Sequence, residues 1–342
     1  MSSPLSTVIW TNFIGKRFLQ GLSESGYVDL QIPHTENECI QRTNNAAVLI
    51  TDDSKLDAAF VDAVTSNTSK LRWIQLANAG YDNACRAAIP EHITVTNVGS
   101  ILAPVVAEHA IALMLALTRR IPEMVRLQNA ALYNQEPFRR VTSIEGSRVA
   151  IVGFGNVGIA FARRIRAFGA HIVAVTRTGS SHPDADEAHS ITNLEKLLPS
   201  LDIVVLALPL SDATRGFFGS KQIESMKWGA MLINVGRGEL VDTRALEDAL
   251  VSGRLGGAAL DVLSPEPLPQ DHTLWRAPNC LISPHLGGWG RTGASQHFSS
   301  LFIENVRRYL AGAALLNILP LGSHAARKSK VSVLDKGDVD IE

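Results

Sequence analysis

The 342-residue chain lacks the features that mark several special classes of protein. Its only cysteines, Cys39, Cys85 and Cys280, lie far apart and form no CxxC pair, so we expect neither a disulfide framework nor a metal site. Lys and Arg number 32 against 33 Asp and Glu, which gives a net charge of -1. Because proteins that bind duplexes carry a basic excess, nucleic acid is not expected as a partner.

Long apolar runs are also missing. Residues 1–10 contain no basic segment followed by an apolar one, so the sequence predicts no signal peptide. The most apolar helical stretch, residues 110–117, is far shorter than the roughly 20 residues needed to span a bilayer. We therefore expect a soluble, cytoplasmic protein without a membrane partner.

What is present is an ordinary globular composition, with 46% hydrophobic residues, 26 Gly and 15 Pro. At about 150 residues per domain, the length predicts two domains. Short apolar runs alternate with helix-like segments along the first hundred residues, which indicates parallel βαβ units. The expected strands there are residues 7–10, 46–50, 73–76 and 93–96, and the expected helices are residues 14–25 and 55–66.

A long apolar helix is predicted over residues 103–120, with Pro104 in its first turn. For its polar residues Glu108 and His109 we expect structural hydrogen bonds rather than catalysis. A second alternating series of strands and helices begins at Arg148. Its expected strands are residues 148–152, 171–175, 203–208, 230–234, 258–262 and 280–282, and its expected helices are residues 156–168, 243–252 and 292–311.

A glycine loop follows the first strand of the second series. Residues 153–158 read G-x-G-x-x-G between a predicted strand and a predicted helix, the context in which this motif binds a dinucleotide. The first glycine permits the tight turn, the second lets the backbone approach a pyrophosphate, and the third allows close packing. The helix N-terminus adds free N–H groups for the anion. We interpret as cofactor-binding residues Gly153, Phe154, Gly155, Asn156, Val157 and Gly158; the structural alternative is a turn that binds nothing.

The end of the next strand bears on cofactor choice. NAD-binding folds place Asp or Glu there to accept hydrogen bonds from the adenosine ribose, but this chain reads Thr176-Arg177-Thr178. Arg177 can pair with a 2′-phosphate and Thr178 can donate a hydrogen bond to it. The sequence therefore favours NADP(H), with NAD(H) beside a solvated Arg177 as the alternative.

Three stretches beyond predicted strand ends carry reactive side chains, at the edge where an open α/β sheet binds its ligand. They are residues 233–238, residues 259–267 and residues 283–288. Arg237 can hold the carboxylate of a 2-oxo acid and polarise its carbonyl. His285 can give a proton to the developing alkoxide, and Glu266 can orient the imidazole and favour its charged form. Taken singly, each also has a plain reading, as a surface arginine, a loop histidine or an exposed turn.

With these motifs, the sequence resembles the D-isomer-specific 2-hydroxyacid dehydrogenases over roughly residues 45–320. The resemblance includes the glycine loop, residues 234–238, 260–267 and 284–288, together with residues 106–109 and 202–209. It implies that Arg237, Glu266 and His285 form a catalytic set. It also implies that the substrate meets N–H groups of the segment Asn78, Ala79 and Gly80. Further residues expected around the cofactor are Leu208, Pro209, Val235, Gly236, Arg237, Asp261, His285 and Gly287, with Asp261 towards the nicotinamide carboxamide.

The resemblance further implies an α/β fold of two doubly wound parallel-sheet domains, a Rossmann domain inserted into a flavodoxin-like one. The substrate domain then comprises residues 1–102 and 290–320, and the dinucleotide domain residues 103–289; residues 321–342 are expected to form a flexible tail. A homodimer is expected, with the helix after residue 103 at its interface. Relatives that oxidise formate carry Gln where this chain has Glu266, which argues against that activity.

The reading that unites these features is NAD(P)H-dependent reduction of a 2-oxo acid to a D-2-hydroxy acid. Two alternatives remain at this point. One is an NAD-dependent dehydrogenase that works mainly in the oxidative direction. The other is a non-catalytic, NAD(H)-sensing protein that resembles a corepressor, although the retained Arg237, Glu266 and His285 favour turnover.

Overall fold

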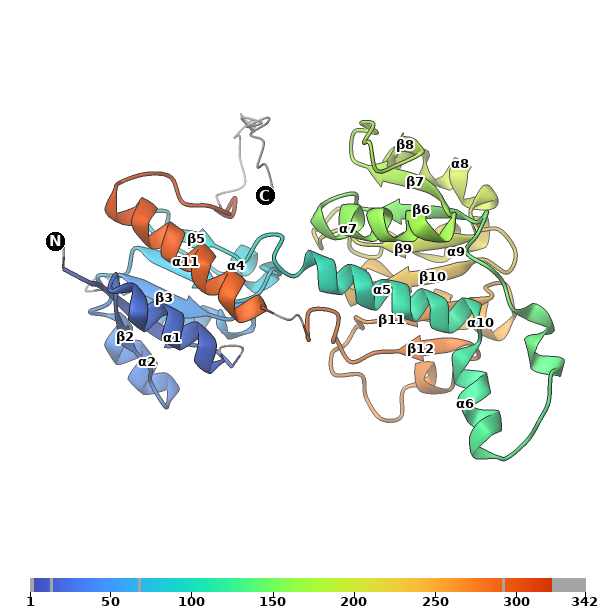
Figure 1. The fold of residues 1–342 in the computed structure, drawn as a ribbon, viewed down its shortest axis with the longest axis horizontal. Coiled ribbons are helices and arrows are strands. Elements are labelled where there is room, and N and C mark those ends of the chain that lie inside the picture. The colour runs from blue at the N-terminus through green and yellow to red at the C-terminus, as the bar shows by residue number, and fades with distance from the viewer. Residues whose placement is uncertain (1–2, 13–14, 67–68, 291–292, 322–342) are drawn as a thin grey trace, which may run out of the picture.

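The computed structural model describes residues 3–12, 15–66, 69–290 and 293–321. Within those residues the strands form two parallel sheets, one of five strands and one of seven, each with helices packed on it (Figure 1). The predicted class, two parallel-sheet α/β domains, is confirmed. None of the helices in the described part of the chain is long and apolar enough to cross a membrane.

The first sheet has the strand order β2-β1-β3-β4-β5. Its strands are β1 (Leu5–Trp10), β2 (Val28–Gln31), β3 (Val48–Thr51), β4 (Trp73–Leu76) and β5 (Thr94–Thr96), and its helices are α1 (Lys16–Ser25), α2 (Glu36–Thr43), α3 (Ala58–Val64) and α4 (Asp82–Arg86). The central strands β3 and β4 are buried at every position, as expected for a parallel sheet covered on both faces. The sequence analysis missed β2, α2 and α4.

The second sheet has the order β12-β11-β10-β9-β6-β7-β8. Its strands are β6 (Arg148–Val152), β7 (His171–Thr176), β8 (Glu187–Ser190), β9 (Ile203–Leu206), β10 (Met231–Asn234), β11 (Gly257–Leu260) and β12 (Cys280–Ile282), with helices α7 (Asn156–Ile165), α8 (Leu194–Leu197), α9 (Ser220–Ser225) and α10 (Thr243–Val251). The strand order reverses between β6 and β9. Ligands of doubly wound sheets bind beyond the strand ends at such a reversal.

Helix α5 (Ala103–Thr118) follows the first sheet in the chain and precedes the second, and helix α11 (Ala294–Leu310) follows the second sheet. Helix α5 packs along α7 and against β10 and β11, and α6 (Ile121–Asn129) follows it. Helix α11 returns to the first sheet beside α1, so both ends of the described chain contribute to that layer (Figure 1). Phe298 of α11 stacks on Phe18 of α1, and Phe302 stacks on Trp73 of β4. This packing buries the apolar stripe of α11.

The predicted domain limits at residues 102 and 289 lie in the connections on either side of the second sheet and stay a prediction. Of the predicted tail, residues 321–342, only Leu321 is among the described residues. It packs against the apolar cluster on the first sheet. The remainder of that prediction lies outside the described part of the chain.

Candidate active site

Arg237 lies in the loop after β10, and the side chain of Asn234 forms hydrogen bonds to the backbone of that loop. The Asn234 carboxamide accepts a hydrogen bond from Gly236 N (3.0 Å) and donates one to Arg237 O (2.8 Å). Asn234 is almost completely buried, so its two polar ends have no water to compete for them. The loop after β10 is thereby fixed with the Arg237 side chain directed away from the sheet.

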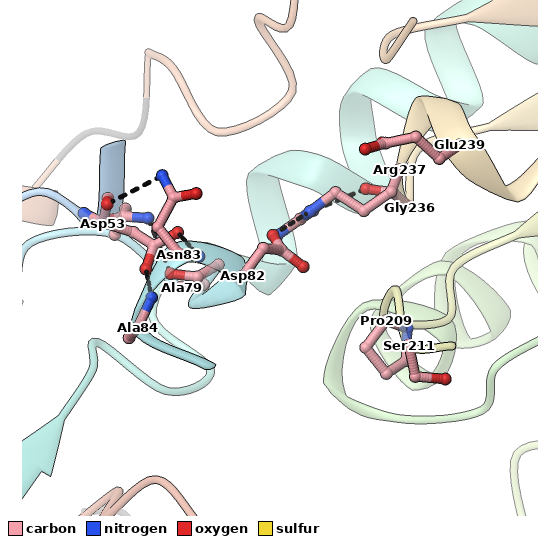
Figure 2. A network of polar contacts seen from close by, with 12 residues as sticks. Asp53, Ala79, Asp82, Asn83, Ala84, Pro209, Ser211, Gly236, Arg237 and Glu239 are labelled. Atoms are coloured by element: carbon pink, nitrogen blue, oxygen red, sulfur yellow. Dashed lines mark hydrogen bonds and ion pairs between the residues drawn. The ribbon is translucent and has the colours of Figure 1, made fainter. Parts of the chain in front are cut away.

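The Arg237 side chain reaches across to the first sheet (Figure 2). Its Nε donates to Asp82 Oδ2 of α4 at 2.7 Å, its Nη1 donates to Gly236 O at 2.6 Å, and its Nη2 lies directly against Gly80. The two charged side chains are only 27% and 26% exposed, so solvent screens the pair less than a surface ion pair. These contacts orient the guanidinium plane and leave further N–H groups for a ligand.

The predicted substrate segment, residues 78–80, lies beside that guanidinium. Asn78 Nδ2 donates to Gly80 O (2.9 Å), and Asn97 Nδ2 donates to Ala79 O (2.7 Å). Within the described residues, the N–H groups of Ala79 and Gly80 form no hydrogen bond. The carbonyl groups of the segment are thus occupied, whereas two N–H donors next to Arg237 remain available for an anion.

Asp53 supports the same segment from behind. Its carboxylate accepts hydrogen bonds from the N–H groups of Asn83 and Ala84, both at 2.9 Å (Figure 2). Its own N–H donates to Asn78 Oδ1 at 2.9 Å. Burial raises the pKa of the Asp53 carboxyl above its ordinary value, and the two backbone hydrogen bonds oppose that rise. Asp53 therefore fixes the start of α4, the helix that carries Asp82.

His285 and Glu266 face each other, with His285 Nδ1 at 2.9 Å from Glu266 Oε2. The hydrogen bond to Glu266 raises the pKa of His285 above its ordinary value, against the opposing effects of burial and of the Arg237 charge. Burial alone would raise the pKa of Glu266, but the hydrogen bonds from His285 and from Leu263 N outweigh it and the pKa is lowered. The pair therefore favours a charged imidazole beside a carboxylate.

Asp261 lies behind His285, at the end of β11. It is 3% exposed, and its carboxylate accepts hydrogen bonds from Leu286 N and Gly287 N, both at 2.9 Å, and from Ser283 Oγ at 2.7 Å. His109 Nε2 of α5 lies 3.1 Å from the same carboxylate. Most of these donors reach Oδ1, and Gly287 N is the one that reaches Oδ2. The contact of Asp261 with a nicotinamide carboxamide stays a prediction.

The glycine loop lies beside the loops after β9 and β10. Gly153 has a φ of +98° and its N–H donates to Val175 O of β7 (2.9 Å). A Cβ at Gly153 would come within 2.6 Å of Leu208 N, so only glycine fits this turn. Leu208 O is also in close contact with Gly236. Backbone of the glycine loop, of Leu208 and of Gly236 thus forms one continuous surface, which Val235, buried behind Gly236, supports.

The other predicted cofactor residues line the edges of this surface. Pro209 is exposed after Leu208, and Phe154 of the glycine loop makes an edge contact with the His182 ring, 5.1 Å between centroids. At the end of β7, Thr176 Oγ1 accepts from Gly179 N (2.9 Å), and Thr178 Oγ1 shares a hydrogen bond with Ser180 Oγ (2.8 Å). Arg177 is exposed and, within the described part of the chain, forms no ion pair.

Sequence reasoning missed Asp82, Asn97 and the partners of His109. The only available signal for Asp82 was its position two residues after Gly80. For Ser283 it was the place immediately before Pro284-His285. The predicted structural role of His109 agrees with its contacts, since its Nε2 lies 2.8 Å from Ser283 Oγ.

Comparison with known proteins identifies the family. The model of the D-isomer specific 2-hydroxyacid dehydrogenase NAD binding domain matches residues 111–287, more than half of the chain. Glyoxylate/hydroxypyruvate reductase B of Escherichia fergusonii is 33% identical over 260 residues, which are 75% of this chain and 79% of the relative.

Solved structures of the same family are also similar to this chain. A D-isomer specific 2-hydroxyacid dehydrogenase family protein from Aeromonas salmonicida gives a TM-score of 0.83 at 26% identity, over 94% of this chain and 100% of that chain. A D-isomer specific 2-hydroxyacid dehydrogenase from Xanthobacter autotrophicus, in complex with NADPH and MES, gives 0.77 at 25% identity, over 93% and 98%. The chain belongs to the D-isomer-specific 2-hydroxyacid dehydrogenase family, oxidoreductases with a nicotinamide-cofactor domain.

Proposed function

We propose that this protein reduces a 2-oxo acid to a D-2-hydroxy acid with NAD(P)H. The observation that carries the proposal is the close approach of Arg237 to Gly80, in a segment where the N–H groups of Ala79 and Gly80 form no hydrogen bond within the described residues. The Arg237 charge also lowers the pKa of His285, as the smallest of the effects that act on that imidazole, so the cation lies within electrostatic reach of the candidate acid. A carboxylate binder beside a proton donor is the arrangement that a 2-oxo acid requires.

Arg237 binds the substrate carboxylate and polarises the neighbouring carbonyl. Asp82 and Gly236 O hold two of its N–H groups, so the rest of the planar fork is preorganised for that anion. The free N–H groups of Ala79 and Gly80 add neutral donors to the same oxygens. Preorganised donors of this kind stabilise charge that develops on the reacting carbonyl oxygen.

His285 supplies the proton. Because Nδ1 is engaged by Glu266, the other ring nitrogen, Nε2, carries the proton that goes to the carbonyl oxygen. Glu266 favours the charged imidazole, because its hydrogen bond raises the pKa of His285. The two residues therefore form an acid–orienting pair on the dinucleotide side of the site.

The residues around the glycine loop fit a dinucleotide. No side chain caps the N-terminus of α7, a Cβ at Gly155 would face open space, and Gly153 brings the backbone close to Leu208. Uncapped N–H groups at a helix start suit a pyrophosphate. The cofactor supplies the hydride when it is bound. Asn156 and Val157 begin α7 at this loop. Pro209, Val235, Asp261 and Gly287 stay predicted cofactor residues.

An NADPH-oxidation screen tests the reaction. Purified protein is incubated with NADPH and with 2-oxo acids of increasing size, from glyoxylate and hydroxypyruvate to branched 2-oxo acids and phenylpyruvate. Substrate-dependent oxidation with at least one of them is the expected result. NADPH binding without oxidation of any would contradict the proposal and favour a corepressor-like binding protein, whereas turnover only of 2-hydroxy acids with NAD would favour the oxidative alternative.

We further infer a preference for NADP(H), supported by the lack of a carboxylate at residues 176–178 and by the exposed Arg177. The test is kcat/KM with NADPH and with NADH for wild type and for Arg177→Ala. Loss of one charge-assisted contact to a 2′-phosphate should cost NADPH about tenfold and leave NADH unchanged. Arg164→Ala, which removes an exposed arginine of α7, is the matched control. A wild-type preference for NADH would overturn this inference.

Homodimer formation is a further part of the proposal. Helix α6 and the segment after it expose Ile121, Met124, Val125, Leu132 and Tyr133. Exposed apolar side chains that cluster in this way mark interaction surfaces, and α5 lies directly before them. Light scattering after gel filtration should give twice the chain mass. A monomer at micromolar concentration would contradict the dimer without affecting the proposed reaction.

We also propose the division into a substrate domain of residues 1–102 with 290–320 and a dinucleotide domain of residues 103–289. The return of α11 to the first sheet supports it. A fragment of residues 103–289 should fold and bind NADPH by itself. An unfolded fragment would contradict those limits.

A further inference from the structure

We propose that His109 is a positioning residue for His285, acting through Ser283 and Asp261 to hold the backbone of residues 285–287. The inference rests on the proposed function, in which His285 is the acid. It concerns side chains that lie behind the loop rather than in the site. His109 belongs to α5, Asp261 follows β11 and Ser283 follows β12, so three elements converge on one loop.

Residues 285–287 are wrapped around Asp261. His285 N donates to the main-chain oxygen of Asp261 at 2.8 Å, Leu286 N donates to Oδ1 at 2.9 Å, and Gly287 N donates to Oδ2 at 2.9 Å. Three consecutive N–H groups thus converge on a single residue. A Cβ at Gly287 would come within 2.6 Å of Oδ2, so the approach requires glycine at that place.

The wrapping holds His285 in an unfavourable backbone conformation. Its φ is +56°, in the left-handed region that non-glycine residues seldom adopt. Such a conformation persists only where the surroundings determine it, and it costs of order 1 kcal/mol or more. The hydrogen bonds from residues 285–287 to Asp261 impose this backbone conformation on His285. If the Asp261 carboxylate shifts, the direction of the His285 side chain changes with it.

Ser283 and His109 fix the position of that carboxylate. The Ser283 hydroxyl donates its hydrogen to Asp261 Oδ1 at 2.7 Å. Because that hydrogen is used, His109 Nε2, at 2.8 Å from Ser283 Oγ, must be the donor to the hydroxyl oxygen, and it lies 3.1 Å from Oδ1 as well. His109 therefore carries a hydrogen on Nε2 and serves both acceptors.

Helix α5 is a firm support for this donor. Ala107 and Ala110, which lie close to His109 in this helix, are fully buried. The helix also packs along α7. The Asp261 carboxylate is therefore anchored to a packed helix rather than to another loop. A rigid anchor keeps a catalytic side chain within the narrow range of geometry that proton transfer needs.

The charge state of His285 gives a readout that a purely structural role of His109 would not change. The charged groups that act on His285 are Glu266 and Asp261, which raise its pKa, and Arg237, which lowers it. If the loop loosens, the 2.9 Å contact with Glu266 weakens and the pKa of His285 falls towards its ordinary value of about 6.5.

The experiment is an NMR titration of the His285 imidazole in the full chain, with its signal assigned by loss in His285→Gln. His109→Leu removes the donor, His109→Gln keeps an N–H donor of similar reach, and Ser283→Ala removes the bridging hydroxyl. Glu108→Gln is the control, since it changes an exposed residue of the same helix. Circular dichroism verifies that each variant is folded.

We expect a lower pKa of His285 in His109→Leu and Ser283→Ala, and values near wild type in His109→Gln and Glu108→Gln. With a 2-oxo acid that turns over, kcat of His109→Leu should fall about fivefold, the loss expected for one hydrogen bond, at unchanged NADPH affinity. An unchanged pKa of His285 in both His109→Leu and Ser283→Ala would overturn the inference. Because the titration needs no substrate, failure of the proposed reaction would be seen separately, as a wild type without turnover.

Discussion

Arg237 and His285, the two cationic side chains of the candidate site, are held in different ways. Arg237 follows β10 of the second sheet, but its Nε is held by Asp82 of helix α4, which follows β4 of the first sheet. His285 is held by Glu266 and Asp261, both of which follow strand β11 of its own sheet. The proposed carboxylate binder thus depends on how the two halves of the structure meet, whereas the proposed proton donor depends on the second sheet and on helix α5, which packs against it.

This difference separates two steps of the proposed reaction. A change that alters the contact between the sheets should disturb Arg237, and with it substrate binding, while the charge of His285 stays as it was. A change behind the loop of residues 285–287 should do the reverse. Variants of Arg237 and Asp82, and variants of His285 and Glu266, therefore test whether the two side chains are held independently.

Removing the proton donor should have the largest effect. We expect His285→Ala to lower kcat by about 10²- to 10⁴-fold, the usual contribution of a positioned general acid, with NADPH affinity nearly unchanged. Single-turnover NADPH oxidation and a fluorescence titration of NADPH measure the two quantities. His92→Ala is the control, because His92 is exposed in the connection between α4 and β5. Wild-type kcat in His285→Ala would remove His285 from the mechanism.

Replacing the carboxylate binder should come next. In Arg237→Lys the charge remains, but an ammonium cannot contact Asp82 and still present a planar fork. We expect kcat/KM for the 2-oxo acid to fall about 10- to 100-fold, as for loss of one or two charge-assisted hydrogen bonds. Steady-state kinetics with Arg244→Lys, an exposed arginine of α10, as control measures this. Unchanged kcat/KM would show that a point charge is sufficient.

Asp82 tests the dependence on the contact between the sheets. Asp82→Ala frees the Arg237 Nε, and KM for the 2-oxo acid should rise about tenfold, because a hydrogen bond to a charged group is lost. Asp82→Asn keeps an oxygen acceptor and should recover most of the loss. The pKa of His285 should change little in both variants, because the Arg237 charge is the smallest of the effects that act on it. If it shifted as much as KM, the two cations would not be held independently.

A smaller effect is expected from the orienting carboxylate. Reduction requires protonated His285, so its rate is highest below the pKa of His285 and is lost as pH rises through that pKa. Glu266 raises this pKa, so Glu266→Gln should move the basic limb of the kcat/KM profile to lower pH. Near pH 7 we expect a decrease of a few fold, growing with pH. A basic limb at its wild-type position would exclude Glu266 as the group that charges His285.

Local patterns in the sequence predicted the parts of the site that local physics determines. The glycine loop was predictable because Gly153 and its neighbours must form a tight turn between a strand and a helix, whatever surrounds them. The chemistry proposed for Arg237, Glu266 and His285 followed from side-chain types placed after strands. Most central strands were equally clear, because they are continuous apolar runs.

Contacts between distant segments were not predictable in this way. Asp82 and Arg237 are 155 residues apart, and only the packing of the two sheets brings them together. The edge strand β2 has no buried residue and contains Asp29, so the sequence has no apolar run there that would predict a strand. Asp261 was expected towards the nicotinamide. Its hydrogen bonds to the loop of residues 285–287 depend on a left-handed His285, which no pattern in a single sequence reveals.

The configuration of the 2-hydroxy acid product tests the proposed reaction most directly. Wild-type protein is incubated with NADPH and a 2-oxo acid that supports oxidation, and the 2-hydroxy acid is resolved by chiral chromatography. We expect the D isomer, formed in an amount equal to the NADPH consumed, and almost none from His285→Ala. An L product, a racemate, or NADPH consumption without a 2-hydroxy acid would contradict the proposed arrangement of Arg237 and His285.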